Sequence, residues 1–374
     1  MGVILINLVE LFELKRKVAN ELYEGLSEGA RVKAREDHHS RRKPRPCGIT
    51  IHTGVGCSYA CAYCYIYDMG FPANVKPYPL NALEIAYALA LNPYVIPKRT
   101  MAAYGSVTEP FLPETAKQAI SYMAEVYKWL KLPTQVSTKT LITNELAEGI
   151  CQGDPKASIL VSVTTLRNRR LEPKAPDPIE RIKFAGDASK AGLAVSLFIR
   201  PIIPGVTDAE LGDILNIAVE SGVKSIVLGS LRVTERILKN LKSLGVNVKE
   251  VEKRLTKPLK GVKQVETKMA DLKGRFISMA EDLGLTVFKA ACEANAHAHG
   301  AYCAMCSIGP CNINVKPNHV ESSDVKDLLD HLGVKYYNVK VTENKIEVNL
   351  KDKDRSDYLE TVIKLATYRR TILL

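Results

Sequence analysis

Residues 54–65, Gly-Val-Gly-Cys-Ser-Tyr-Ala-Cys-Ala-Tyr-Cys-Tyr, decide how the chain folds, because they place three cysteines, Cys57, Cys61 and Cys64, in one short loop. The stretch follows an apolar run at residues 49–51 that is typical of a strand end. A structural zinc site and an ordinary electron-transfer cluster each need four ligands. Three thiolates instead hold three irons of a [4Fe–4S] cube and leave the fourth open to an exogenous ligand. The alternatives are a zinc knuckle or three buried thiols.

The spacing Cys-x3-Cys-x2-Cys, with Tyr63 just before the last cysteine, resembles the signature of the radical S-adenosylmethionine (SAM) enzymes. In that family SAM chelates the open iron, and one electron from the reduced cluster cleaves it to methionine and a 5′-deoxyadenosyl radical. The resemblance implies that Cys57, Cys61 and Cys64 ligate the cluster and that the Tyr63 backbone meets the adenine. It also implies SAM as cofactor and a reducing partner such as a ferredoxin or flavodoxin.

Composition and length set the broad class of the protein. A chain of 374 residues, 46% hydrophobic and 25% charged, is typical of one large barrel domain with an appendage. No apolar run approaches the roughly 18 residues of a membrane helix, and the first residues do not read as an export signal. We therefore expect a cytoplasmic protein without a membrane partner, in which two tight groups among the nine cysteines serve metal sites rather than disulfides.

The net charge of +11 favours a polyanionic partner such as nucleic acid. The alternative is a generally basic surface in a heat-adapted protein rich in Lys, Arg and Glu. Basic residues concentrate at positions 31–45, beside His38 and His39, after a predicted helix at 5–26. Such a run is typical of a solvated segment, and a polyanion-binding arm is the alternative. Cys47 is interpreted as a lone buried thiol.

Strand and helix patterns alternate through the middle of the chain. Strands are predicted at residues 49–51, 100–104, 134–137, 159–166, 193–200 and 225–229, with helices between them. Repeats of this length predict right-handed βαβ units and a parallel sheet, so we expect an α/β fold with a (β/α)6 partial TIM barrel. The expected divisions are a helical and basic extension (1–46), the barrel (47–231) and a small α+β module (232–374).

Polar residues follow the predicted strands at their C-terminal ends, where such a barrel carries its chemistry. Gly105 permits close backbone approach, and Glu109 offers a charge for an ammonium group. Alternatives are a loop salt bridge for Lys139 and a structural ion pair for Arg200. By resemblance to the family, the positions expected around SAM or substrate are Tyr63, Gly105, Ser106, Glu109, Ser137, Lys139, Thr164, Thr165, Arg200, Ile202 and Ile203.

Several segments look like the spore photoproduct lyase-like branch of the superfamily, over residues 48–229. They are Val-Thr-Glu-Pro at 107–110, Leu-Glu-Pro-Lys-Ala-Pro at 171–176, and Pro-Ile-Ile-Pro-Gly at 201–205 with Asp208. The true lyases carry a hydrogen-donating cysteine in a stretch that corresponds to residues 103–108 here. That stretch holds Gly105 and Ser106 but no cysteine, and a hydroxyl is a poor hydrogen-atom donor. A relative with another task is favoured over a DNA photoproduct lyase.

A second cysteine group, Cys292, Cys303, Cys306 and Cys311, lies near the C-terminus. Four thiolates close a site, so a second [4Fe–4S] cluster and a structural zinc are both chemically sound. Many radical SAM relatives carry auxiliary clusters, which favours iron–sulfur. Two short strands at 336–341 and 345–350 and a helix at 357–369 follow, and they are interpreted as a capping or partner-recognition element.

The resulting hypothesis is a radical SAM enzyme acting on an unidentified substrate. Nucleic acid or a nucleotide-like molecule is the leading substrate class, and a peptide is next. The reaction class stays open among lyase, oxidoreductase and transferase. The alternative from another class is a non-catalytic iron–sulfur or zinc protein that binds nucleic acid, with both cysteine groups structural.

Overall fold

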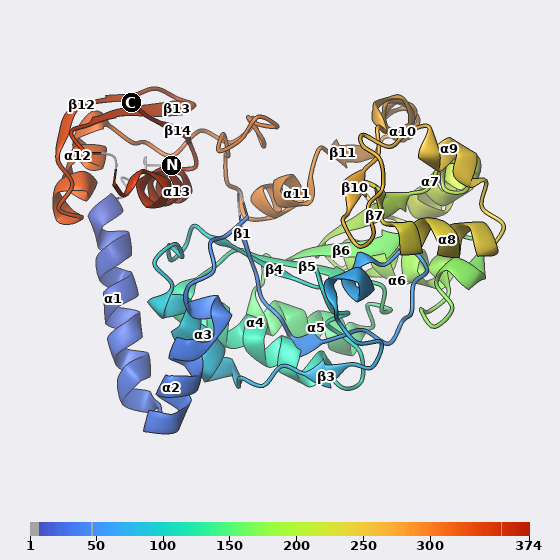
Figure 1. Cartoon of the computed structure of the whole chain (residues 1–374), viewed down its shortest axis with the longest axis horizontal. Coiled ribbons are helices and arrows are strands. Elements are labelled where there is room, and N and C mark those ends of the chain that lie inside the picture. The colour runs from blue at the N-terminus through green and yellow to red at the C-terminus, as the bar shows by residue number, and fades with distance from the viewer. Residues whose placement is uncertain (1–6, 46–47, 353) are drawn as a thin grey trace.

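A seven-stranded parallel sheet is the centre of the computed structural model, which describes residues 7–45, 48–352 and 354–374. The strand order is β1-β4-β5-β6-β7-β8-β11, and each neighbouring pair runs parallel (Figure 1). Six of these strands were predicted. They are β1 (Gly48–Thr50), β4 (Met101–Tyr104), β5 (Thr134–Thr138), β6 (Ser158–Val163), β7 (Ala194–Ile202) and β8 (Ser225–Ser230).

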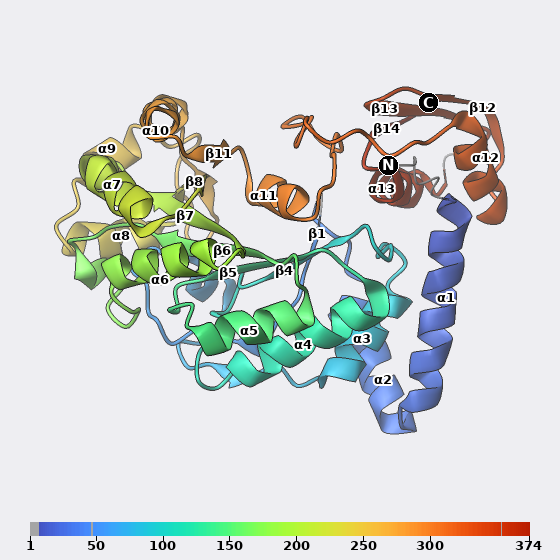
Figure 2. The same cartoon turned by 180° about the vertical axis from the view of Figure 1, so that it is seen from behind.

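Helices connect successive strands and cover one face of the sheet (Figure 2). They are α3 (Ala82–Leu91), α4 (Ala116–Leu130), α5 (Asn144–Gly153), α6 (Pro178–Lys190) and α7 (Leu211–Ser221). Every residue of β6 is buried, as a parallel strand covered on both faces requires. Sequential strands that pair in parallel through intervening helices confirm the partial TIM barrel.

The seventh strand, β11 (Thr286–Phe288), pairs with β8 and so belongs to the sheet, although we expected it in the C-terminal module. Between β8 and β11 the chain forms a layer at that edge (Figure 1). Its elements are β9 (Arg232–Val233), α8 (Glu235–Ser243), α9 (Val248–Glu252), β10 (Val265–Glu266) and α10 (Ala270–Asp282). The division of the chain at residues 46 and 231 stays a prediction, but residues 286–288 complete the sheet.

Helix α11 (Ala291–Ala298) packs against the sheet directly after β11. It contributes Ala294 to a small core with Leu160 of β6, Phe198 of β7 and Val227 of β8. Side chains alternate between the two faces of a strand, so Leu160 shares a face with Ser162, and Phe198 with Arg200. The helix therefore packs on the face that also carries the polar residues described below.

The N-terminal extension consists of α1 (Leu8–Gly25), α2 (Glu28–Glu36) and the 3-10 helix η1 (His38–Ser40). It packs against α3, and α1 also reaches the C-terminal module (Figure 1). Within residues 31–45, α2 and η1 are helical and the His39 side chain is fully buried. Five basic residues of the segment are nevertheless exposed, namely Lys33, Arg35, Arg41, Lys43 and Arg45. Cys47 lies outside the described residues.

The C-terminal module forms a second, smaller core. It contains α12 (Ser322–His331), β12 (Tyr336–Val341), β13 (Lys345–Leu350), α13 (Ser356–Thr367) and β14 (Arg370–Leu373). The predicted hairpin and helix are confirmed, and β14 adds a strand that pairs in parallel with β13. Leu8 and Leu11 of α1 complete this core, so the two ends of the chain pack together. In the described part of the chain, no helix is long and apolar enough to cross a membrane.

Candidate active site

The three cysteines of the first group lie on the loop between β2 (Gly54–Val55) and the 3-10 helix η2 (Tyr65–Met69). Gly56 adopts a φ of +86°, and a Cβ there would lie 2.5 Å from the carbonyl oxygens of Asn74 and Pro72. The Cys57 N–H donates to the Pro72 carbonyl at 3.2 Å. The strand β3 (Lys76–Pro77) pairs with β2 just after this contact. The loop therefore folds back closely on itself, which only glycine permits at position 56.

Side chains from outside the loop hold its backbone carbonyls. The Tyr67 hydroxyl donates to the Cys57 carbonyl at 3.0 Å, and Arg236 of α8 donates to the Cys64 carbonyl at 2.5 Å. Arg236 also pairs with Asp68 at 2.7 Å. Sequence reasoning missed Arg236, because it lies more than 170 residues from the loop it holds. These contacts fix the cysteines in one arrangement.

Burial raises the pKa of all three thiols, and that of Cys61 rises to about 12. The exposed fraction of Cys61 is 7%, whereas Cys57 and Cys64 are half-buried. Thiols with raised pKa values stay protonated at neutral pH unless a cation stabilises the thiolate. Bound iron supplies that cation, so the donor set fits a metal cluster.

A cavity of about 230 Å³ opens beside the loop, at the C-terminal ends of the sheet strands. Cys64 forms part of its wall, as do six of the predicted residues. These six are Tyr63, Gly105, Ser106, Ser137, Lys139 and Arg200. The structure thus brings the cysteine loop and residues from the first, second, third and fifth strand units to one cavity.

Gly105 forms the tight turn after β4. Its φ is +85°, and a Cβ at this position would lie 2.0 Å from the Ser137 carbonyl oxygen. The next carbonyl, that of Ser106, accepts a hydrogen bond from the Tyr65 hydroxyl at 3.0 Å. The turn is therefore pressed against β5 and tied to the cysteine loop.

We expect Gly105→Ala to weaken SAM binding about 100-fold, the effect of a displacement of about 1 Å in a positioning element. The added methyl group displaces the turn or β5, because the Ser137 carbonyl is a backbone atom that cannot rotate away. Equilibrium binding of SAM to the anaerobically loaded protein measures the effect. Gly70→Ala is the matched control, since Gly70 also has a positive φ but an added Cβ meets nothing within 4 Å. Equal affinity in the two variants would contradict the role of the Gly105 turn.

A buried charged network lies behind the cavity wall. The Glu172 carboxylate accepts hydrogen bonds from Arg181 and from the Tyr63 hydroxyl, and Lys139 lies 4.0 Å away. The Lys139 ammonium is also 5.7 Å from the centre of the Tyr63 ring. The loop salt bridge that we weighed for Lys139 is therefore present, and Lys139 nevertheless lines the cavity.

Arg200 lies on the cavity wall and forms no ion pair with the described residues, in contrast to the structural pair considered for it. Its side chain runs across Gly229 of β8, where a Cβ would lie 2.5 Å from Arg200 Cγ and Cδ. The guanidinium carbon is 5.4 Å from the centre of the Phe198 ring. Gly229 therefore provides the space in which Arg200 lies.

Five predicted residues are placed in the protein interior, away from the cavity wall. Glu109 accepts hydrogen bonds from the Thr138 hydroxyl at 2.5 Å and the Lys139 N–H at 2.8 Å, so it positions the end of β5. The Thr164 hydroxyl donates to the Tyr63 hydroxyl and to the Arg200 carbonyl, each at 3.0 Å. The remaining three, all buried, are Thr165, Ile202 and Ile203. Direct contact of these five with SAM stays a prediction.

The structure adds cavity residues that sequence reasoning missed. Side chains alternate between the two faces of β5, β6 and β7. This alternation places Gln135, Ser162 and Phe198 on a strand face with predicted site residues or with the core under α11, and all three line the cavity. Tyr65, Ile66 and Pro201 are sequence neighbours of predicted residues. The remaining wall residues lie farther along the chain and had no sequence signal; they are Ser230, Leu231, Arg232 and Ala291.

The second cysteine group gathers around one small hollow. Cys292, Cys303, Cys306 and Cys311 all line it, together with Glu293, Met305 and Ile308. Cys303 and Cys311 face each other through two backbone hydrogen bonds of 3.2 and 2.8 Å. Burial raises the pKa of Cys303 to about 11 and of Cys311 to about 12. The four side chains can therefore hold one metal group that stabilises their thiolates.

His297 and His299 do not line this hollow. His299 instead lies 3.0 Å from the Asp154 carboxylate, and the His297 ring packs against Phe288 with 5.1 Å between centres. The structure thus favours the four cysteines, without a histidine, as the ligands of the second site.

Comparisons with known proteins agree with this geometry. Residues 51–218 match the family model described as the Radical SAM superfamily. A curated relative, the uncharacterized protein ORF301 of Acidianus two-tailed virus, is 22% identical over 175 residues. The match covers 42% of this chain and 56% of that protein, so the chain matches little more than half of that relative's length.

Three of the solved structures that match this chain do so at low sequence identity. A mutant of spore photoproduct lyase has a TM-score of 0.49 at 12% identity, over 63% of this chain and 74% of that one. SuiB of Streptococcus suis bound to S-adenosylmethionine gives 0.44 at 15% identity, over 78% and 65%. Methylornithine synthase gives 0.41 at 14% identity, over 86% and 96%. All three TM-scores are below 0.5, so these structural likenesses carry no argument about function.

Proposed function

We propose that the protein is a radical SAM enzyme, since residues 51–218 match that family model, and that Cys57, Cys61 and Cys64 hold its [4Fe–4S] cluster. The observation that supports this most directly is that the cysteine loop forms one wall of the cavity at the C-terminal edge of the sheet. A reduced cluster held by these three cysteines would supply the electron for the reductive cleavage of SAM, with methionine and 5′-deoxyadenosine as the products to detect. The cavity beside the loop would hold SAM and the substrate.

The residues of the cavity wall have separate tasks in this proposal. The Gly105 turn brings backbone carbonyls close to the SAM amino group, and Arg200 pairs with the SAM carboxylate through its guanidinium. Tyr63 presents its backbone to the adenine, and its buried hydroxyl is held by Glu172 and Thr164. A pre-formed wall of this kind aligns the bond to be broken without further ordering of side chains.

Gly229→Ala tests the role of Arg200 without removing its charge. The added methyl group occupies the space of Arg200 Cγ and Cδ and pushes the guanidinium away from the cavity. We expect the KM for SAM to rise about tenfold or more, the loss of one charged hydrogen bond of about 1.5–3 kcal/mol. Arg200→Lys, which keeps the charge but loses the planar fork, is expected to fall between Gly229→Ala and the wild type. An unchanged KM in all variants would exclude Arg200 from SAM binding.

We propose a second [4Fe–4S] cluster at the four C-terminal cysteines. Ala291 lines the main cavity, and the next residue, Cys292, lines the cysteine hollow. A group at the second site would therefore lie next to the part of the cavity wall that Ala291 forms. Electron relay and substrate anchoring are the roles this position supports, and a structural zinc is the alternative.

Iron and zinc analysis of a Cys303→Ala/Cys306→Ala variant distinguishes the two metals. Loss of about half of the iron and sulfide, with SAM cleavage retained, is the expected result, since only the second site is disrupted. Loss of zinc with unchanged iron would establish the structural alternative. Retention of both metals would show that the hollow binds neither.

The charge of the cavity wall supports a proposal for the substrate class. Lys139, Arg200 and Arg232 are its cationic residues, and Arg232 is held by Glu266 at 3.0 Å. With the net charge of +11, they favour an anionic substrate such as a nucleotide or nucleic acid. Binding of a single-stranded oligonucleotide at two salt concentrations tests this, and we expect Arg232→Glu to weaken it and reduce its salt dependence. Salt-independent binding, or none, would favour a peptide.

A further inference from the structure

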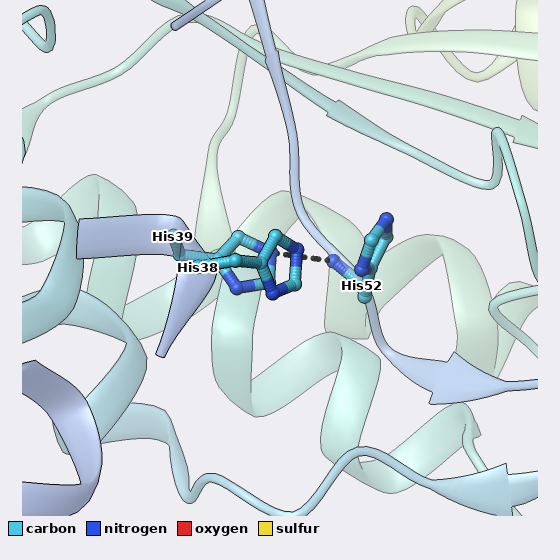
Figure 3. A group of neighbouring side chains, drawn as sticks. All are labelled: His38, His39 and His52. Atoms are coloured by element: carbon cyan, nitrogen blue, oxygen red, sulfur yellow. Dashed lines mark hydrogen bonds between the residues drawn. The ribbon is translucent and has the colours of Figure 1, made fainter. Parts of the chain in front are cut away.

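Three histidines form a cluster that the proposed function does not use. His38 and His39 come from η1, and His52 follows β1 (Figure 3). One candidate ligand atom from each of the three lies within 4.8 Å of the other two. Across residues 7–45, 48–352 and 354–374, no other group of three or more His, Cys, Asp or Glu residues is as close. The ring centres lie 4.1, 4.9 and 5.1 Å apart.

The Asp37 carboxylate orients this cluster through hydrogen bonds. Asp37 Oδ1 lies 2.6 Å from His39 Nδ1, and its other oxygen accepts from the Tyr78 hydroxyl at 2.6 Å. His39 Nε2 accepts the N–H of His52 at 3.2 Å (Figure 3). Nδ1 therefore carries the ring proton and donates to Asp37, and a metal ion on Nε2 would displace the His52 N–H from that nitrogen. A carboxylate on the outer nitrogen of a histidine is the arrangement that fixes metal-ligating imidazoles.

The cluster also contains a ring nitrogen without a partner. His38 Nδ1 lies 3.0 Å from the Tyr78 hydroxyl, whereas His38 Nε2 is buried and makes no hydrogen bond to the described residues. A buried nitrogen left without a partner costs free energy, which a bound cation would recover.

We propose that His38, His39 and His52 bind one Zn²⁺ ion, with a fourth position left for water. Three imidazole nitrogens are a ligand set that zinc accepts. The Arg42 guanidinium lies 3.5 Å from His52 Nε2 and opposes a further positive charge, while the Asp37 carboxylate offsets it. Such an ion would tie η1 of the N-terminal extension to the segment that enters the cysteine loop, five residues before Cys57.

Zinc titration of the full chain tests the site, after iron–sulfur reconstitution and chelator treatment. We expect one Zn²⁺ per chain more in the wild type than in His38→Ala or His52→Ala. We also expect zinc to raise the melting temperature of the wild type only, as a ligand of the folded state does. Asp37→Asn should weaken zinc binding about 10–100-fold. His319→Ala is the matched control, because His319 is exposed and lies outside the cluster.

Co²⁺ provides a readout that does not depend on stability. Cobalt bound by imidazole lacks the thiolate charge-transfer band that cobalt at the cysteine sites would show. The expected result is a spectrum of bound cobalt that lacks the thiolate charge-transfer band and that His38→Ala abolishes. Equal zinc content in the wild type and His38→Ala, or a cobalt spectrum dominated by thiolate, would overturn the proposal. His38→Ala carries the test if His52→Ala does not fold, since the His38 side chain is 37% exposed.

Discussion

Cys57→Ala is expected to abolish the formation of 5′-deoxyadenosine from SAM. With two thiolates remaining, Cys61 and Cys64, the loop cannot hold three irons and leave one open. The measurement is anaerobic reconstitution, dithionite reduction and chromatography of the products. The expected loss exceeds 1,000-fold, because the reaction has no other source of the electron at that position. The iron content of the same samples should fall by the amount that one [4Fe–4S] cluster holds.

Cys151→Ala is the matched control for this prediction. Cys151 lies on α5, is half-buried and belongs to neither cysteine group, so its loss should leave SAM cleavage unchanged. A reduced wild-type cluster that never cleaves SAM would support the alternative of a non-catalytic metal protein. That protein would bind polyanions with a steep dependence on salt. Cleavage that survives in Cys57→Ala would refute the assignment of the ligands.

The sheet could be predicted because each of its strands carries a local signal. The apolar runs at 159–163 and 225–228 are long enough to cross a sheet covered on both faces, and glycines or prolines end the segments between them. The strand at 286–288 lies in the segment that we expected to belong to the C-terminal module, so its pairing with β8 was not predicted. Pairing between β8 and β11 spans about 60 residues, and no residue of either strand specifies its neighbour.

Some positions of the candidate site could likewise be predicted from local sequence, whereas others depend on the tertiary fold. The common loop of Cys57, Cys61 and Cys64 and the tight turn at Gly105 were predictable, because short-range spacing and backbone geometry determine them, whereas their roles stay predictions. The interior positions of Thr164 and Ile203 were not predictable, because one residue along a strand or its end decides which face a side chain occupies. Arg236 and Ala291 reach the site only through the tertiary fold. The histidine cluster likewise depends on η1 packing against the residues after β1.

Arg181→Ala is expected to destabilise the protein by about 3–5 kcal/mol, the cost of leaving a buried charge without its partner. Arg181 and Glu172 have exposed side-chain fractions of 0% and 1%, and the Arg181 guanidinium also donates to the Ser162 carbonyl at 2.5 Å. Denaturant unfolding of the two proteins measures the difference. Because Glu172 also holds Tyr63 and Lys139, we expect SAM cleavage to fall as well.

The same pair gives a defined pH dependence. Burial raises the pKa of Glu172, but the Arg181 guanidinium and Lys139 ammonium outweigh burial and hold it below its ordinary value of 4.5. A carboxyl whose pKa is lower in the folded state contributes stability above its unfolded pKa and loses it as the pH falls through the folded pKa. The contribution should therefore be complete at pH 7 and decline below about pH 5. In Arg181→Ala the acid transition should begin at higher pH.

Arg167→Ala is the control, because its pair with Asp213 has exposed side-chain fractions of 68% and 50%. An exposed pair contributes about 0–1 kcal/mol, so this variant should unfold almost as the wild type does. The double variant Arg181→Met/Glu172→Gln removes both charges and should recover part of the lost stability. If Arg181→Ala and Arg167→Ala unfold alike, the buried network does not hold the cavity wall. The positions of Tyr63 and Lys139 would then depend on packing alone.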